Sequence, residues 1–258
     1  MPSRLLTLIQ NGLADPQAGL RYLLLGRRAA SRFELENLLK LVGIDREELL
    51  SYYQKLDSNI EFTRHIDSML SSHRGLGQTR GGAELYVITR ALRPKTVMET
   101  GVAAGISSSY ILQALADNNE GKLVSLDIPN YEAEYLPKMG RAPVELLPQG
   151  FSTGFAIPTN IRSRWELHVG KSQDSLPSIL ERLGTLDIFF HDSEHTYANM
   201  LFEFRLVWKH LNSNGVLLSD DVSWNRAFSQ FAREVAANAQ RIRTAALGAI
   251  IKSNTAVC

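Results

Sequence analysis

The sequence lacks the features that mark secreted, membrane-spanning and nucleic-acid-binding proteins. Its 258 residues include one cysteine, Cys258, so no disulfide can form within the chain, as is typical of a reducing compartment. No apolar run approaches the roughly 20 residues of a membrane-spanning helix, and the apolar start is too short for a secretory leader. The net charge is +1, and no basic cluster indicates nucleic acid. We therefore expect a soluble cytoplasmic protein that binds neither nucleic acid nor membrane.

What the sequence does contain is an ordinary globular composition, with 44% hydrophobic and 21% charged residues. Capping-box patterns at residues 31–34 and 45–48 mark helix starts in the first third. A glycine-rich stretch over residues 73–82 then reads as a linker. We predict a helical N-terminal cap over residues 1–80 and a main domain over residues 81–258. The cap is expected either to cover the site or to mediate homo-oligomerisation.

Strand-like and helix-like segments alternate through the main domain. Strand patterns cover 96–99, 123–127, 165–169, 186–190 and 216–219, and helical patterns cover 107–116, 175–183, 196–211 and 225–239. This alternation predicts a parallel sheet covered by helices on both faces. The predicted fold class is therefore α/β: a Rossmann-like, doubly wound, mostly parallel sheet with an N-terminal helical cap. Such sheets bind ligands at the carboxyl ends of their strands.

Two stretches lie outside this alternation. Residues 129–164 contain several prolines and glycines, and a loop of this length inside a compact domain is usually functional. We therefore expect it to form a substrate lid. The tail from residue 241 is expected to hold one or two short strands around Gly248.

The segment Glu99-Thr-Gly-Val-Ala-Ala-Gly105 joins a predicted strand to a predicted helix. Glycines let the backbone turn tightly and approach a ligand closely, and the free N–H groups at the helix start favour an anionic group. The dinucleotide fingerprint needs Gly-x-Gly-x-x-Gly; alanines 103 and 104 depart from it, so NAD fits poorly. Asp127 ends the next strand, where a carboxylate accepts hydrogen bonds from ribose hydroxyls.

These residues resemble motif I and the acidic residue of class I methyltransferases. The likeness spans roughly residues 84–222 and is strongest with the catechol O-methyltransferase group and with bacterial sugar and natural-product O-methyltransferases. The latter carry an Asp-x-x-His-x-Tyr segment, which here is 192–197. The resemblance implies S-adenosylmethionine as cofactor, with Ser172 and Gln173 bracketing its adenine. The implied cofactor set is Glu99, Gly101, Gly105, Ser107, Asp127, Ser172, Gln173 and Asp192.

Aspartates follow two of the predicted strands, 186–190 and 216–219, which we expect to be adjacent in the sheet. Asp192 ends one strand and Asp220 and Asp221 end the next, so the three should converge, which is costly unless a cation or protons offset the charge. Hard oxygen ligands suit Mg²⁺, and the resemblance also implies a divalent metal on Asp192, Asp220 and Asp221. In the alternative, Asp192 caps the helix near Thr196 and the other two are solvated loop residues.

His195 lies just beyond Asp192 and matches the place of the catalytic base in the resembling enzymes; the catechol enzymes have lysine there. An imidazole with a pKa of about 6.5 can take a proton near neutral pH. We predict His195 and Asp192 as the catalytic residues and His191, on the other face of its strand, as structural. The predicted function is metal-dependent O-methylation of a small-molecule hydroxyl on a sugar or natural product. A metal-independent N- or carboxyl-methyltransferase and a non-catalytic S-adenosylmethionine-binding module are the alternatives.

Overall fold

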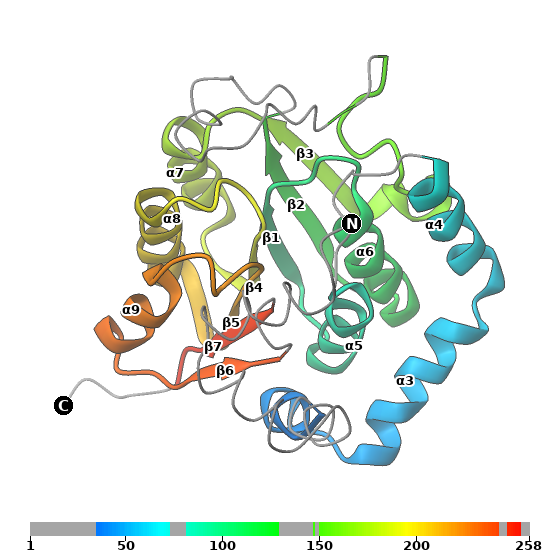
Figure 1. Ribbon diagram of the computed structural model, residues 1–258, viewed down its shortest axis with the longest axis horizontal. Coiled ribbons are helices and arrows are strands. Elements are labelled where there is room, and N and C mark those ends of the chain that lie inside the picture. Colours follow the sequence, from blue (N-terminus) through cyan, green and yellow to red (C-terminus); the bar gives the residue numbers. More distant parts are fainter. Residues whose placement is uncertain (1–34, 73–80, 129–146, 148–149, 243–246, 254–258) are drawn as a thin grey trace, which may run out of the picture.

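The structure, a computed structural model, describes residues 35–72, 81–128, 147, 150–242 and 247–253. Its centre is a seven-stranded sheet in the order β3-β2-β1-β4-β5-β7-β6 (Figure 1). The strands are β1 (Thr96–Thr100), β2 (Lys122–Asp127), β3 (Trp165–Val169), β4 (Leu186–His191), β5 (Leu211–Ser219), β6 (Ala239–Arg241) and β7 (Gly248–Ile251). Strands β1 to β5 are parallel, and β7 pairs antiparallel with both β5 and β6. The strand order reverses at β1, which confirms the predicted doubly wound, mostly parallel sheet.

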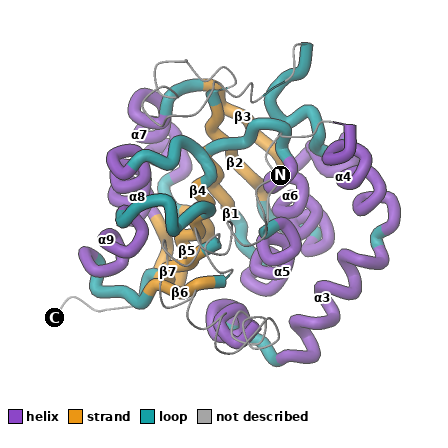
Figure 2. Tube along the Cα trace, viewed as in Figure 1, coloured by secondary structure: helices purple, strands orange, loops and turns teal. Residues whose placement is uncertain are grey.

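Helices cover both faces of the sheet (Figure 2). The face-covering helices are α5 (Gly82–Leu92), α6 (Ile106–Asn118), α7 (Ser172–Leu183), α8 (Tyr197–His210) and α9 (Ala227–Glu234). Helices α7, α8 and α9 lie on one face and α5 and α6 on the other. Val97 and Met98 are neighbours on β1 and both fully buried, yet they pack into different hydrophobic clusters. Burial on both faces explains why the strands read as continuous apolar runs rather than alternating ones.

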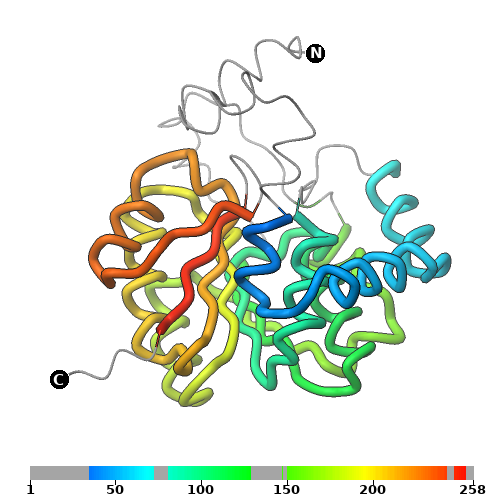
Figure 3. The backbone as a smooth tube through the Cα atoms, turned by 90° about the horizontal axis from the view of Figure 1, so that it is seen from below, coloured from blue at the N-terminus to red at the C-terminus, as the bar shows by residue number. Residues whose placement is uncertain are grey.

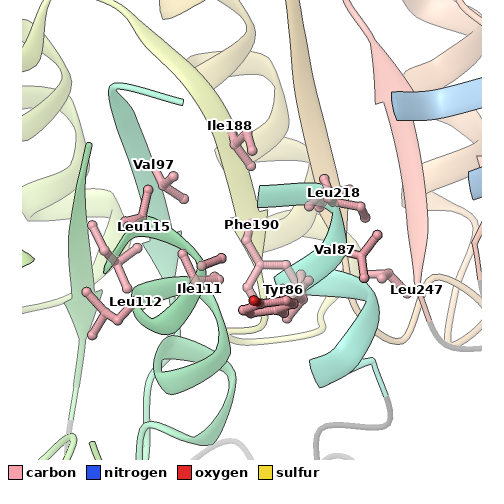
Figure 4. Packing of buried hydrophobic residues seen from close by; sticks show 14 of the residues in the cluster. Tyr86, Val87, Val97, Ile111, Leu112, Leu115, Ile188, Phe190, Leu218 and Leu247 are labelled. Carbon is pink, nitrogen blue, oxygen red and sulfur yellow. The ribbon is translucent and has the colours of Figure 1, made fainter. Parts of the chain in front are cut away.

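The cluster beneath α5 and α6 is shown in Figure 4. Ile111 of α6 and Tyr86 of α5, which is fully buried, lie next to Phe190 of β4, and Leu115 of α6 lies toward Val97 of β1. The Tyr86 hydroxyl donates a hydrogen bond to Asp117 Oδ2 at 2.5 Å, so its polar end is satisfied inside an apolar cluster. This packing holds α6, which begins at the end of the glycine loop, firmly against the sheet.

The N-terminal helices pack outside α5 and α6 (Figure 3). Residues 35–42 are helical, followed by α3 (Arg46–Ser58) and α4 (Ile60–Ser72). Asp45 caps α3 by accepting from Glu48 N at 2.8 Å, as the capping-box pattern predicts; the pattern at 31–34 lies outside the described residues. Leu49 and Ile66 join the cluster beneath α5 and α6. The boundary at residue 80 and self-association through these helices stay predictions.

The structure departs from the predicted elements near the C-terminal end. The helix predicted over 225–239 ends at Glu234, because Ala236 takes a left-handed φ of +50° that a helix does not allow. The chain then forms β6, and β7 confirms the short strand expected at Gly248. Helix α5 follows the predicted linker and was not predicted. Within the described ranges, no helix is long and apolar enough to cross a bilayer, and the cytoplasmic location stays a prediction.

Candidate active site

The strand register brings the predicted acidic residues to one edge of the sheet. Thr100 of β1 is level with His191 of β4, and His191 is level with Ser219 of β5. The backbone continues this register, since Asp192 N donates to Thr100 O at 2.8 Å and Asp220 N donates to His191 O at 2.9 Å. The chain therefore leaves the three strands side by side at their carboxyl ends, where α/β sheets bind ligands.

Two glycines of the loop after β1 adopt backbone conformations that favour glycine. Gly101 has φ +85°, and a Cβ there would lie 2.2 Å from Asp192 O. Gly105 has φ +88°, and its Cβ would lie 2.7 Å from Ile157 Cγ1 and 2.9 Å from Gly154 Cα. Glycine avoids both the backbone strain and the overlap. In this structure the space beside the glycines is therefore taken by the protein's own chain.

The described part of the predicted lid packs on the glycine loop. Gly154 N donates to Ala103 O and Ala156 N donates to Ala104 O, both at 2.9 Å. His65 Nε2 of α4 lies 2.7 Å from Ala156 O, so the N-terminal helices reach the loop through this segment. Residues 150–158 thus support the glycine loop. The greater part of the predicted lid, 129–146 and 148–149, lies outside the described residues.

Asp127 stands at the end of β2, as predicted for a ribose ligand. Its Oδ1 accepts from Val102 N at 3.1 Å and its Oδ2 from Thr153 Oγ1 at 3.0 Å. A carboxylate has about four acceptor positions, so these two bonds orient Asp127 and leave capacity for ribose hydroxyls. The sequence analysis did not predict a role for Thr153, because no motif marks a threonine inside a long loop.

Glu99 and Ser107 lie in the interior. Glu99 is fully buried and accepts hydrogen bonds from Ser107 at 3.1 Å, Ser108 at 2.7 Å and Ser125 at 2.8 Å. Burial raises the pKa of Glu99 to about 7, although the three hydroxyl donors act to lower it. The geometry gives Glu99 and Ser107 the role of holding the start of α6 to β1, and direct cofactor contact by these side chains stays a prediction.

Ser172 and Gln173 begin α7, next to the carboxyl end of β3. The Ser172 hydroxyl donates to Glu203 Oε1 at 2.5 Å, and Gln173 Nε2 donates to Asn199 Oδ1 at 2.7 Å. Both predicted adenine residues are therefore tied to α8. Glu203 was also missed from the sequence, where it stands inside a helical pattern with no motif around it.

His195 and the acidic residues do come together. His195 Nε2 lies 3.6 Å from Asp192 Oδ1 and 3.9 Å from Asp221 Oδ2. Burial, the charges of Asp220 and Asp221 and a hydrogen bond with Asp220 raise the pKa of Asp192 well above its usual range, although the charge of His191 opposes them. The convergence of carboxylates expected from adjacent strand ends is thus present in the structure.

The His195 ring is enclosed but not sealed. Its side chain is 13% exposed, and its Nδ1 atom is buried without a hydrogen-bond partner. Burial lowers the pKa of His195, against the charges of Asp221 and Asp220, which raise it. Asn225 Nδ2 holds the backbone by donating to His195 O at 3.0 Å, and the Trp224 ring lies 5.1 Å away. Trp224, 43% exposed, is a third residue that no sequence motif indicated.

The structure also shows which residue caps α8 and where the His191 side chain lies. Thr196, not Asp192, caps α8, since the Thr196 side chain accepts from Asn199 N at 3.2 Å. His191 is fully buried and hydrogen-bonded to Glu203 Oε2 at 2.7 Å, in agreement with the structural role predicted for it. Asp192 is therefore not used as a helix cap.

The predicted magnesium site is not confirmed. In the described ranges, no group of three or more histidine, cysteine, aspartate or glutamate side chains is arranged to hold a metal ion. The carboxylate oxygens of Asp192, Asp220 and Asp221 are ligands that suit a hard cation. A cation would also offset the mutual repulsion of these carboxylates, which raises the pKa of Asp192. Magnesium binding by these three residues stays a prediction.

The sheet order and the ligand edge define a class I methyltransferase fold. Residues 98–222, which run from β1 to just beyond Asp221, match the family model for a methyltransferase domain. Residues 98–222 are thus similar to a methyltransferase domain, and the sheet order agrees with the Rossmann-like fold of class I, S-adenosylmethionine-dependent methyltransferases. No curated protein sequence matches it.

Solved methyltransferase structures share this fold. The SAH-bound methyltransferase PaMTH1 of Podospora anserina has 15% identity and a TM-score of 0.52, with 82% of this chain and 97% of that one covered. The O-methyltransferase of Bacillus cereus in complex with SAH has 16% identity and a TM-score of 0.51, covering 79% and 100%. TomG of Streptomyces achromogenes, an O-methyltransferase involved in tomaymycin synthesis, in complex with SAM, has 16% identity and a TM-score of 0.52, covering 82% and 100%. At these sequence identities the similarity shows a shared fold alone.

Proposed function

We propose that this enzyme transfers a methyl group from S-adenosylmethionine to a hydroxyl oxygen of a small molecule, a sugar or another natural product, with His195 as the base. The observation that carries the proposal is the position of His195 Nε2, 3.6 Å from Asp192 Oδ1 and 3.9 Å from Asp221 Oδ2. Cofactor binding alone needs neither an imidazole nor these carboxylates. Two proteins of similar fold, the Bacillus cereus enzyme and TomG, are O-methyltransferases, which supports oxygen as the acceptor atom.

The residues act by orienting the reactants and moving one proton. S-adenosylmethionine, when bound, supplies a methyl group already activated by its sulfonium. Asp127 orients the ribose through its free acceptor positions, and Ser172 and Gln173 flank the adenine. His195 Nε2 takes the proton from the acceptor hydroxyl, a contribution of typically 10²- to 10⁴-fold in rate. Asp192 holds the imidazole in place and stabilises its charged form.

A divalent cation, Mg²⁺ in the first instance, is the second part of the proposal. Asp192, Asp220 and Asp221 would hold it, and it would lower the pKa of the acceptor hydroxyl. The support is their crowding at adjacent strand ends, which raises the pKa of Asp192. Because the carboxylates are not arranged as a ligand group, they would have to turn toward a common point.

Trp224 supports an acceptor with a flat ring or a sugar face. Its indole is 43% exposed and lies beside the His195 ring at a centroid distance of 5.1 Å. Large aromatic side chains at binding sites provide apolar contact area and stack on rings. An acceptor ring resting on Trp224 would have its hydroxyl next to His195.

The test is methyl transfer by the purified full chain to phenols, catechols, sugars, amines and carboxylic acids, followed by mass spectrometry. We expect transfer to hydroxyls, loss of at least about 100-fold in His195→Gln, and inhibition by a chelator that added Mg²⁺ reverses. His210→Gln, on the far end of α8, is the matched control. Transfer only to nitrogen or carboxylates, or activity that a chelator leaves unchanged, supports the metal-independent alternative. Binding of the cofactor with no transfer to any acceptor supports the binding module.

A further inference from the structure

One buried carboxylate connects the cofactor side of the site with the acceptor side. Glu203 of α8 is fully buried and accepts hydrogen bonds from five side chains. The donors are Thr100 at 2.6 Å, Ser172 at 2.5 Å, His191 at 2.7 Å, Ser193 at 2.8 Å and Asn199 at 3.1 Å. They come from β1, α7, β4, the loop after β4 and α8 itself.

The two oxygens of Glu203 accept hydrogen bonds from residues on both the adenine side and the acceptor side of the site. Oε1 accepts from Ser172, which begins α7 on the adenine side, and from Ser193, which follows Asp192 on the acceptor side. Oε2 accepts from His191, which precedes Asp192. A shift of either side against the other would break a hydrogen bond to the same buried carboxylate, and an unpaired buried charge is strongly unfavourable.

The connection continues to the predicted base. Glu203 Oε2 accepts a hydrogen bond from His191 Nδ1. The His191 ring packs edge-on against the His195 ring, with their centroids 5.2 Å apart. The His191 Nε2 atom is buried without a hydrogen-bond partner. The ring is therefore oriented through Nδ1, which lies 2.7 Å from Glu203 Oε2 and 3.5 Å from Ser193 Oγ. Packing alone does not require such an arrangement, because apolar residues often replace buried ion pairs without loss of stability.

We propose that Glu203 is a positioning residue that aligns the cofactor side with the acceptor side, through Ser172 on the one and through His191 and Ser193 on the other. The inference rests on the proposed function for the assignment of these two sides. It predicts that changes at Glu203 affect both cofactor affinity and turnover. Changes at Ser172 or Ser193 should each act mainly on one of them.

The first experiment titrates SAH into the full-length Glu203→Gln and Glu203→Asp variants by calorimetry. An amide nitrogen cannot accept the hydrogen bonds, so Glu203→Gln should weaken SAH binding about tenfold or more. Glu203→Asp keeps the carboxylate and should recover part of the affinity, which a purely steric role for the side chain would not predict. Ser178→Ala is the matched control, since Ser178 is exposed on α7 and donates only to Ser175 O of its own helix. It should bind SAH as the wild type does.

The second experiment reads the acceptor side without an acceptor. In histidine-labelled protein, the His191 and His195 imidazole NMR signals should shift on SAH binding in the wild type. In Glu203→Gln the His191 signal should already be displaced and the response at His195 lost. With an acceptor in hand, Ser172→Ala should raise the KM for S-adenosylmethionine more than it lowers kcat, and Ser193→Ala should do the reverse.

The proposal is overturned if folded Glu203→Gln keeps wild-type SAH affinity and wild-type histidine signals. If that variant does not fold, Ser172→Ala and Ser193→Ala decide, because each leaves the carboxylate intact and removes one donor. In that case, wild-type SAH affinity in Ser172→Ala together with unchanged His195 signals in Ser193→Ala would contradict the positioning role of Glu203. SAH binding by a wild type that methylates no acceptor would count against the proposed reaction only, since the readouts at Glu203 need no acceptor.

Discussion

Gly101 and Asp192 lie so close that a Cβ atom on Gly101 would stand 2.2 Å from the carbonyl oxygen of Asp192. Gly101 lies in the glycine loop after β1, and Asp192 begins the acidic segment after β4. The two segments are 91 positions apart in the sequence and in van der Waals contact in the fold. The glycine loop therefore helps to set the position of the acidic segment.

Gly101→Ala tests this contact. The new methyl group would overlap the Asp192 backbone at a φ of +85°, so we expect a loss of well over about 1 kcal/mol in the free energy of unfolding and weaker SAH binding. Gly184→Ala is the matched control, because Gly184 has φ +73° with nothing within 4 Å of the added atom. Denaturant unfolding and calorimetry measure both. Equal losses in the two variants would mean that backbone strain, and not contact with Asp192, is the cause.

Asp127→Asn tests the ribose assignment. The amide loses the charge and part of the acceptor capacity of the carboxylate, and a hydrogen bond to a charged group is worth about 1.5–3 kcal/mol. We therefore expect the Kd for SAH to rise about 10- to 100-fold. Thr153→Val, which removes the bond that orients Oδ2, should have a smaller effect in the same direction. Asp57→Asn, on the exposed side of α3, serves as control, and an unchanged titration of Asp127→Asn would remove the assignment.

Asp192→Asn separates chemistry from cofactor binding. Asp192 lies 3.6 Å from His195 Nε2, so loss of its charge should lower turnover by about 10²- to 10⁴-fold. The SAH affinity should change far less, since Asp127, Ser172 and Gln173 remain. Steady-state rates with the best acceptor measure turnover, and calorimetry measures SAH affinity. Glu181→Gln on α7 is the control. Wild-type turnover in Asp192→Asn would exclude Asp192 from the mechanism.

Glu99→Gln tests a pH-dependent stability. The pKa of Glu99 rises from 4.5 to about 7 on folding, so between these values the folded protein binds more protons than the unfolded chain. Stability contributed by this group is fully present below about pH 4.5 and is lost as the pH rises through about 7. The wild type should therefore lose about 3 kcal/mol relative to Glu99→Gln over that range. Urea unfolding at several pH values measures the difference, and a pH-independent difference would contradict the shift.

Much of the fold could be predicted because its signals are local. The strand over Trp165–Val169 was predicted with its observed bounds, and the capping box at Asp45 appears as a hydrogen bond to Glu48 N. Each depends on residues that are neighbours in the chain. The strand ends carrying Asp127, Asp192 and Asp220 followed from the same patterns, because parallel strands in a sheet end at one edge.

Other features had no local signal. Thr153 reaches Asp127 across 26 positions and Ser172 reaches Glu203 across 31, and no spacing rule predicts such a pair. Helix α9 ended early because Ala236 turns left-handed, although its composition favoured a longer helix. The hydrogen bonds depend on segments that are distant in the sequence, and in α9 the tertiary structure outweighed the preference of the local sequence.

The sequence by itself determined the alternation of strands and helices from β1 to α8, the glycine loop at 99–105 and the placing of acidic residues at strand ends. These depend on hydrophobic periodicity and on backbone freedom, which are properties of short segments. Only the tertiary structure decided that Glu99 faces inward, that residues 150–158 support the glycine loop, and that Glu203 accepts hydrogen bonds from β1, β4 and α7 as well as from its own helix. The reason is physical: a buried carboxylate must find its donors wherever folding brings them, and that depends on the packing of the whole domain.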